Sequence, residues 1–347
     1  NSIWSTMYLT DQNKFLLNQG WQQMKDPVYA FLKALYPNDA TISENLLFKN
    51  TTPADYNFKN PSYTQDYNIN MSGGNDKGHY YAGIGYNNSE GLPISSYYKR
   101  YSFILNGDYQ IKSWLNSASS FNFNRANWQA MPGSNTSEAN YFSRVISLPP
   151  TVRFTSEDGT PRLGNNSGDG NQSFQNDLFF VFNQTDKFTM NQSFKIDFTK
   201  NLFLKLSANI YYSEAYNETF NRDFRTSATA FNTTRSSSAN FDRVFDQTYN
   251  AVLNYQKQIK DHFVTALVGT EYYDTYNYGV YAAGSGAATD DFRDLALTSA
   301  DKDKRSIDSW HAQQRILSFF GRVNYDYMSK YLLSLVVRRD GYSRLID

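Results

Sequence analysis

The chain has 347 residues, of which 40% are hydrophobic and 17% aromatic, and its 33 basic residues balance its 33 acidic ones. A zero net charge removes the electrostatic attraction on which nucleic-acid binding depends, and the absence of cysteine excludes disulfides and thiolate metal sites. No apolar run approaches the ~18 residues of a transmembrane helix, but a transmembrane β-barrel, whose strands bury only alternate residues, remains allowed.

Residues 1–64 contain two short predicted helices rather than strands. Thr10 can cap a helix that Gly20 ends, and Asp26, followed by proline, can start a second helix over Val28–Tyr36. We expect this segment to be an extracellular loop insertion, on the side of the sheet that carries the long connections.

The rest of the chain, residues 65–347, is predicted to be antiparallel β-structure. Its clearest stretch runs from Lys187 to Ser213, where apolar and polar side chains alternate on both sides of a tight turn at Lys200 and Asn201. Each arm has about a dozen residues, whereas an average strand has ~5–6 and a membrane-crossing strand needs ~9–11. The pattern predicts a hairpin with one face toward lipid.

The same alternation recurs along the chain, and we predict about ten strands. They are Tyr67–Ser72, Tyr80–Asn87, Tyr101–Tyr109, Trp114–Asn127, Phe188–Thr199, Leu202–Ser213, Phe241–Lys257, His262–Tyr278, Leu317–Tyr327 and Tyr331–Asp340. Tyrosines gather near several strand ends, where the aromatic girdles of membrane barrels lie.

The connections between these strands alternate between short turns and long loops. The predicted long loops are Asn88–Ser96, Trp128–Asp186, Ala215–Asn240 and Gly279–Gln313, and each is separated from the next by a short turn. Short turns on one rim and long loops on the other are typical of outer-membrane barrels. The other interpretation of the aromatic residues is the core of a soluble β-sandwich.

No group of residues predicts catalysis. The three histidines, His79, His262 and His311, lack metal-ligand spacing, and no glycine-rich stretch opens a helix as a phosphate-binding loop would. The sequence therefore predicts a protein that is not an enzyme and has no cofactor or metal site.

Three segments resemble the SusC-like TonB-dependent transporters of the Gram-negative outer membrane. They are YNINMSGGNDK with YYAGIGYNNSEG at Tyr67–Gly91, YKRYSFILNGD at Tyr98–Asp108, and FGRVNYDYMSKYLLSLVVRRDGYSR at Phe320–Arg344. The third is the most specific, because it fixes a turn, a strand register and a charged strand end together. The pattern departs from the family at Leu345, where an aromatic residue is more usual.

The resemblance implies a large all-β transmembrane barrel, of twenty-two strands when complete, in the cell outer membrane. It further implies a plug domain inside the barrel, a SusD-like surface lipoprotein that acts as a lid, and TonB as the energy source through an N-terminal region absent from this chain. The imported nutrient would be an oligosaccharide or an oligopeptide. Since ten strands alone would leave two long edges unpaired in lipid, we expect the full polypeptide to be roughly three times longer.

Candidate ligand contacts are the aromatic and arginine side chains of the predicted long loops. They are Trp128, Arg153, Arg162, Tyr216, Arg222, Arg225 and Tyr281. The alternative is that these side chains contact the plug, the lid or lipopolysaccharide.

We interpret the two adjacent arginines Arg338 and Arg339 as structural residues. Adjacent strand residues face opposite sides, and a charge facing lipid at mid-membrane costs ~2–4 kcal/mol. We therefore expect both arginines at the outer rim, where Asp340 or Asp326 could pair with them.

Two other functions remain open at this stage. A passive porin or an adhesive barrel would have the same wall but no energy coupling. A soluble glycan-binding β-protein would use the aromatic rings as stacking surfaces.

Overall fold

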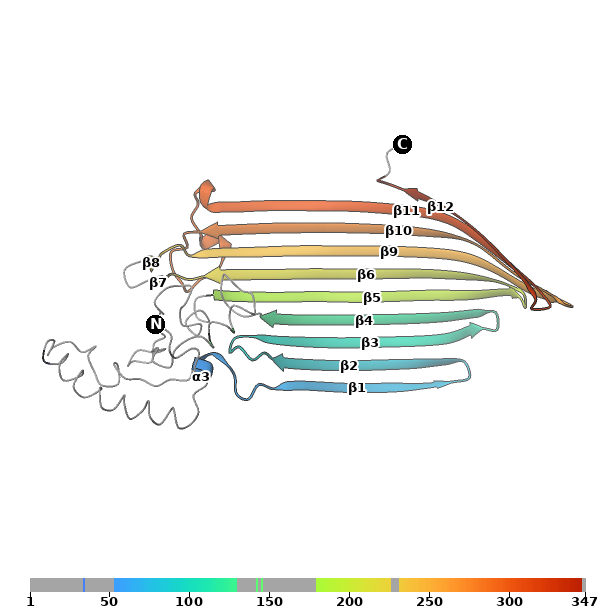
Figure 1. Cartoon of the computed structure of the whole chain (residues 1–347), viewed down its shortest axis with the longest axis horizontal. Helices are drawn as coiled ribbons and strands as arrows, with labels where there is room; N and C mark the ends of the chain where they lie inside the picture. Colours follow the sequence, from blue (N-terminus) through green and yellow to red (C-terminus); the bar gives the residue numbers. More distant parts are fainter. Residues whose placement is uncertain are drawn as a thin grey trace.

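The computed structural model describes residues 53–129, 179–225 and 231–344, together with Ala34, Phe142 and Val145. Within these ranges the chain forms a ten-stranded antiparallel sheet in the order β1-β2-β3-β4-β5-β6-β9-β10-β11-β12 (Figure 1). The ten predicted strands are therefore confirmed. Every strand pairs with its neighbour along the chain once the small β7–β8 hairpin is set aside, so the sheet is a simple meander.

The strands are much longer than those of an average globular protein. Their bounds are β1 Thr64–Asn75, β2 Gly78–Glu90, β3 Tyr97–Lys112, β4 Leu115–Gln129, β5 Phe179–Thr199, β6 Leu202–Asn221, β9 Ser236–Ile259, β10 His262–Ser285, β11 Arg305–Tyr327 and β12 Tyr331–Tyr342. The small elements are α3 Pro53–Asn57, β7 Phe224–Arg225, β8 Phe231–Asn232, and the 3-10 helices η1 Leu295–Leu297 and η2 Lys302–Lys304.

Short turns and long connections lie at opposite ends of the sheet, as predicted (Figure 1). Thr199 and Leu202 bound a two-residue turn, and at the same end of the sheet Tyr327 and Tyr331 bound a three-residue turn. In the second turn Met328 and Ser329 adopt positive φ, which lets three residues reverse the chain. The helix α3 and the β7–β8 hairpin lie at the opposite end.

The strands run further toward the loop end than the alternation predicted. The connections are therefore residues 91–96, 130–178, 222–235 and 286–304, each shorter than the predicted loop. The physical reason is that periodicity reports which side chains meet lipid, whereas a strand continues as long as its backbone finds a hydrogen-bonding partner. Beyond the apolar zone, polar residues occur on both faces and the alternation disappears.

The predicted insertion at residues 1–64 lies mostly outside the described residues, and so do both of its predicted helices apart from Ala34, which is helical within the second. The described part holds α3 and the segment leading into β1.

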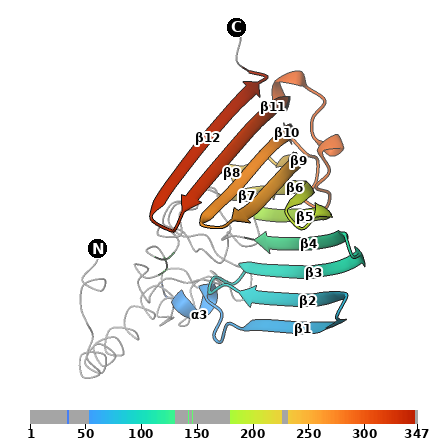
Figure 2. The same ribbon diagram turned by 90° about the vertical axis from the view of Figure 1, so that its right-hand side faces the viewer.

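One face of the sheet is apolar and exposed. On β11 it carries Leu317 and Phe319, and on the edge strands it carries Ile69 at 77% and Val337 at 73% exposure. We call this the outward face; the opposite, inward face carries residues such as Ser318 and Asn324. Figure 2 shows that the sheet is a single curved layer. Within the described residues no second sheet covers the apolar side chains, in contrast to a β-sandwich.

The described residues include no helix that is long and apolar enough to cross a membrane.

Candidate functional site

The inward face is polar: it carries many small hydrogen-bonding side chains, together with charged side chains such as Lys195, Asp197 and Arg322. Asn191 donates to Ser120 across β4 and β5 at 3.1 Å, and Asn324 accepts from Ser334 at 2.8 Å across β11 and β12. Amides and hydroxyls of this kind can both donate and accept, so they suit contact with water or a polar ligand.

A charged cluster lies on the inward face near the end of β12. Arg338 donates to Glu271 at 2.9 Å and to Asp340 at 2.8 Å, and also contacts the buried Ser318 hydroxyl. The register places Arg338 opposite Phe320, facing inward, and Arg339 opposite Phe319, facing outward. The expected pairing with Asp340 is confirmed for Arg338. Asp326 instead accepts from the backbone N–H of Ser329 in the β11–β12 turn. The expected placement at the outer rim is wrong, because Arg338 and Arg339 lie only seven and eight residues beyond Tyr331 at the short turn, where the outward face is still apolar.

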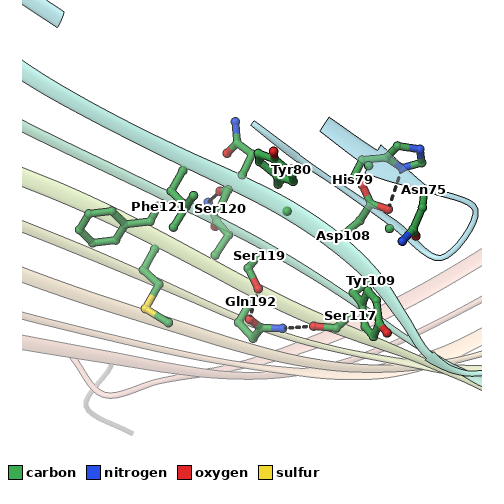
Figure 3. A pocket seen from close by; sticks show the side chains of 17 residues that line it. Asn75, His79, Tyr80, Asp108, Tyr109, Ser117, Ser119, Ser120, Phe121 and Gln192 are labelled. Atoms are coloured by element: carbon green, nitrogen blue, oxygen red, sulfur yellow. Dashed lines mark hydrogen bonds and ion pairs between the residues drawn. The ribbon is translucent and has the colours of Figure 1, made fainter. Parts of the chain in front are cut away.

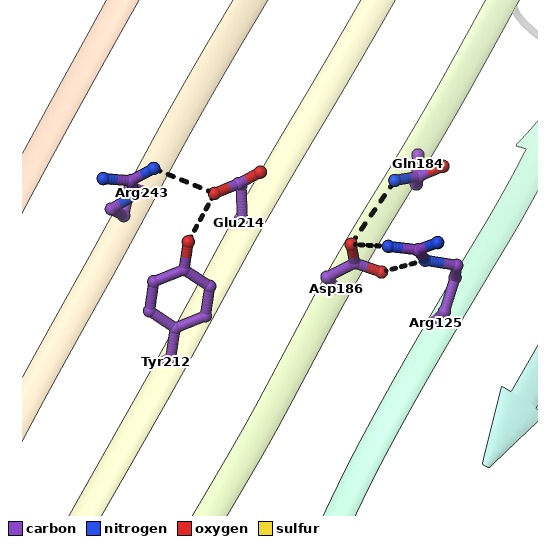
Figure 4. A network of polar contacts seen from close by, with 6 residues as sticks. All are labelled: Arg125, Gln184, Asp186, Tyr212, Glu214 and Arg243. Carbon is purple, nitrogen blue, oxygen red and sulfur yellow. Dashed lines mark hydrogen bonds and ion pairs between the residues drawn. The ribbon is translucent and has the colours of Figure 1, made fainter.

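The outward face carries ion pairs at the loop-end border of its apolar zone. We call three of them the outer ion-pair row: Arg125–Asp186 at 2.6 Å, Arg243–Glu214 at 3.1 Å and Arg315–Asp274 at 3.1 Å. In Figure 4 the Asp186 carboxylate meets the Arg125 guanidinium through two hydrogen bonds, and Tyr212 joins Arg243 on Glu214. Each charge that faces outward here therefore has an opposite charge beside it.

The outer ion-pair row lies one membrane thickness from the short turns. On β10 the segment from His262 at the turn to Asp274 in the row has about 12 residues. At about 3.3 Å per residue and a tilt of about 40°, it spans about 30 Å along the membrane normal, close to the height of a barrel's apolar band plus its interface. The row therefore marks where the hydrocarbon zone ends.

The outward face has a pocket of about 880 Å³ near the short turns of β1–β4. Gly107, Ser117 and Ser119 leave space between larger side chains such as Tyr109 and Phe121 (Figure 3). The Gln192 amide donates to Ser117 at 2.9 Å and accepts from Ser119. These contacts give the polar groups of the cluster hydrogen-bond partners within the protein. Polar groups that face lipid need such partners, because lipid offers none.

Two loops at the other end are joined by one arginine. Arg235 bonds Asp223 at 2.7 Å and Asp290 at 2.7 Å, which connects residues 222–235 to residues 286–304. The hydrogen bond donated to Asp290 and the charges of both aspartates raise the pKa of the Arg235 guanidinium, so it stays charged. Gly286 donates to the Arg235 carbonyl at 2.7 Å as well. These loops therefore form one unit.

Within the second loop, Asp301 accepts hydrogen bonds that hold a tight turn. Contacts with Ser299 and Lys304 lower the pKa of the Asp301 carboxyl, and the Lys304 ammonium lies 3.3 Å away.

Three of the predicted contact residues lie on strands instead of in loops. Trp128 lies on β4, Tyr216 on β6 and Tyr281 on β10. These strands extend toward the loop end beyond the segment in which apolar and polar residues alternate. The register places Trp128 and Tyr281 on the inward face. Tyr216 lies on the outward face, where it donates to Glu218 and its ring lies tilted against that of Phe182, so we omit it from the proposed contacts.

The predicted arginines are not gathered at one place by the described residues. Arg222 is exposed between β6 and β7, and Arg225 belongs to β7. Arg153 and Arg162 lie outside the described residues. Sequence reasoning missed the inward asparagines Asn183 and Asn217, because a lone asparagine in a strand gives no signal until register aligns it with others.

No group of three histidine or acidic side chains in the described ranges is arranged to hold a metal ion.

Comparison with known proteins places this sheet among TonB-dependent receptors. No family model matches the chain. It is 26% identical over 310 residues to TonB-dependent receptor P26 of Formosa agariphila, covering 83% of this chain and 28% of that protein. It is 32% identical over 93 residues to TonB-dependent receptor P3 of the same organism, covering 26% of this chain and 9% of that protein.

Among solved structures, the RagAB peptide transporter has the same fold. Its TM-score is 0.72 at 21% identity, over 94% of this chain and 38% of the transporter chain. The open-open state of the RagAB peptide importer gives a TM-score of 0.73 at 22% identity, over 93% and 37% of the two chains.

The chain thus spans between a quarter and two fifths of the receptor P26 and RagAB chains. All of these relatives are named as receptors or transporters, which supports the prediction that the protein is not an enzyme. The motifs, the ten-stranded sheet and these relatives together support the prediction that the chain is part of the barrel wall of a SusC-like TonB-dependent transporter.

Proposed function

We propose that the protein containing this wall imports an oligomeric nutrient across the outer membrane, using energy delivered by TonB. The single observation that carries the proposal is the asymmetry of the sheet: an exposed apolar outward face bounded by ion pairs, and a polar, hydrogen-bonding inward face. Such a wall separates lipid from a polar passage. The TonB-dependent receptors among its relatives support the energy coupling.

The mechanism involves binding and gating without covalent chemistry. A ligand is captured at the loop end of the barrel, enclosed beneath a SusD-like lipoprotein, and released inward when TonB displaces the plug. The joined loops at residues 222–235 and 286–304 give this lid a firm rim to meet. The RagAB structures, named as a peptide transporter and importer, support a two-component assembly of this kind.

The test measures uptake of isotope-labelled oligomers, both glycans and peptides, by cells that carry the intact protein. Uptake should require both this protein and TonB. A passive porin would retain uptake in cells without TonB, and it would also give steady open channels in planar bilayers. Purification of the intact protein in mild detergent should bring a surface lipoprotein with it, whereas an adhesive barrel should purify alone.

A further inference from the structure

Seven side chains lie in direct register across the inward face, near the loop end. Following the strands from β3 to β11, they are Tyr98, Trp128, Asn183, Asn217, Asn240, Tyr281 and Asp308. Paired residues in an antiparallel sheet point to the same face, so all seven share one side of the wall. We call this set the amide row, after the three asparagines at its centre.

The central asparagines are held in place and still have hydrogen-bonding capacity to spare. Asn217 donates to the Asn183 side-chain oxygen at 2.7 Å, and Asn183 donates to the Trp128 carbonyl at 3.1 Å. Asn240 donates to Asp242 at 2.6 Å. A carboxamide has two N–H donors and an oxygen with two lone pairs, so each asparagine keeps at least one further position for a ligand.

Aromatic rings stand at both ends of these amides. Trp128 lies on the β4 side and Tyr281, which is 41% exposed, on the β10 side, while Tyr98 at 38% exposure extends the row onto β3. The two flanking rings are four strand spacings apart, or about 19 Å at about 4.8 Å per spacing. An elongated ligand lying across the strands would meet a ring, three amides and another ring in turn.

The row is nearly free of charge. Asp308 at its β11 end is its one ionisable carboxylate. Two further inward charges lie two residues closer to the short turns: Arg100 on β3, and Asp242 on β9, whose carboxylate accepts from Asn240. An oligopeptide brings an ionised terminus at each end, whereas the three central side chains are neutral amides and the Asp242 carboxylate beside them already accepts from Asn240. A neutral ligand has no such requirement.

The spacing of the amides also distinguishes between ligand types. An extended peptide repeats every ~3.3 Å, which does not match the ~4.8 Å between strands. A sugar ring with its linkage has nearly the length of one strand spacing. Its hydroxyls both donate and accept, as a carboxamide does, and the flat faces of the sugar can stack on Trp128 and Tyr281.

We propose that the amide row binds a neutral oligosaccharide lying across strands β4 to β10. This inference rests on the proposed import function and adds to it the chemical class of the cargo and the wall residues that contact it. Asn217 and the two flanking rings are expected to contribute most, because they combine the central amide with both stacking surfaces.

The test is isothermal titration calorimetry on the intact protein in detergent. The probes are neutral hexaoses (maltohexaose, cellohexaose and laminarihexaose), the acidic hexagalacturonate, and the peptide hexa-alanine. At least one neutral hexaose should bind. The variants Trp128→Ala and Asn217→Leu should each weaken that binding about tenfold, as expected for loss of a stacking surface or a hydrogen bond.

Tyr216→Ala is the matched control, since Tyr216 precedes Asn217 on β6 and faces outward. It should leave binding within about twofold of the unmodified protein. Heat-modifiable migration on gels confirms that each variant is folded.

Three results would overturn the inference. They are failure of every neutral hexaose to bind, loss of hexa-alanine or hexagalacturonate binding in the row variants, or an equal loss in the Tyr216→Ala control. These outcomes are separate from failure of the proposed function. Uptake that persists without TonB would refute energy-coupled import while leaving the binding result unaffected.

Discussion

The outward and inward faces of this wall differ in how their polar side chains are hydrogen-bonded. On the outward face several of them occur in self-contained sets, such as Arg125 with Asp186 or Gln192 with two serines. On the inward face, asparagines such as Asn217 and Asn240 retain unused hydrogen-bonding positions. Lipid offers no partner, so an outward polar group must bring its own. The comparison teaches that only the inward face is built to receive a polar ligand.

The largest expected effect comes from a charge placed on the wrong face. Ile210→Arg puts a guanidinium on the outward face of β6, between the short turn and Glu214. It should lower the free energy of unfolding by about 2–4 kcal/mol, the cost of an arginine facing the bilayer interior. Denaturant unfolding of the intact protein in lipid vesicles measures this.

The neighbouring residue provides the control for that experiment. Asn209→Arg introduces the same charge one position away on the inward face, opposite Thr248. Its unfolding free energy should change by less than about 0.5 kcal/mol. Equal destabilisation by both variants would mean that the two faces do not differ as described.

A smaller effect is expected from the outer ion-pair row. A double-mutant cycle with Arg125→Ala and Asp186→Ala should give a coupling energy of about 0.5–1 kcal/mol, at the upper end for partly exposed pairs because the contact is bidentate. High salt should reduce the coupling. A coupling near zero would mean that the row carries no energetic pairing at the membrane border.

Loosening the joined loops should leave the barrel wall unaffected. Arg235→Ala removes the group that bridges Asp223 and Asp290, so amide hydrogen exchange should accelerate within residues 222–235 and 286–304. Exchange in β9 and β10 should stay as it was. Arg222→Ala, in the same loop but exposed, serves as the control. If amide hydrogen exchange in both loops stayed unchanged, Arg235 would not be the residue that joins the two loops.

The smallest effect is a local dependence on pH. Because the pKa of Asp301 is lowered in the folded protein, its contribution to the turn is fully present above the ordinary aspartate pKa of about 3.9 and is lost as pH falls through the lower folded value. Exchange at residues 299–304 should therefore rise only in strong acid. Asp301→Asn should remove this dependence, and a rise at neutral pH would contradict it.

Much of the fold followed from the sequence because lipid imposes a strict period of two. Leu202 to Ser213 alternates so regularly that both the strand and its turn at Lys200 and Asn201 were predicted correctly. Strand residues beyond the lipid zone do not face lipid, so the period of two is no longer imposed on them. That is why Tyr216 and Tyr281 were predicted in loops although both lie in strands.

The sequence by itself determined the class of wall, its ten strands, the separation of short turns from long connections, and the resemblance to SusC-like transporters. Each depends on local alternation or on a contiguous motif, which can be recognised without knowing the pairing. Only the tertiary structure decided which residues meet across strands. Asn183, Asn217 and Asn240 are far from Trp128 in sequence, and the register alone aligns them, because strand pairing is set by hydrogen bonds between distant segments.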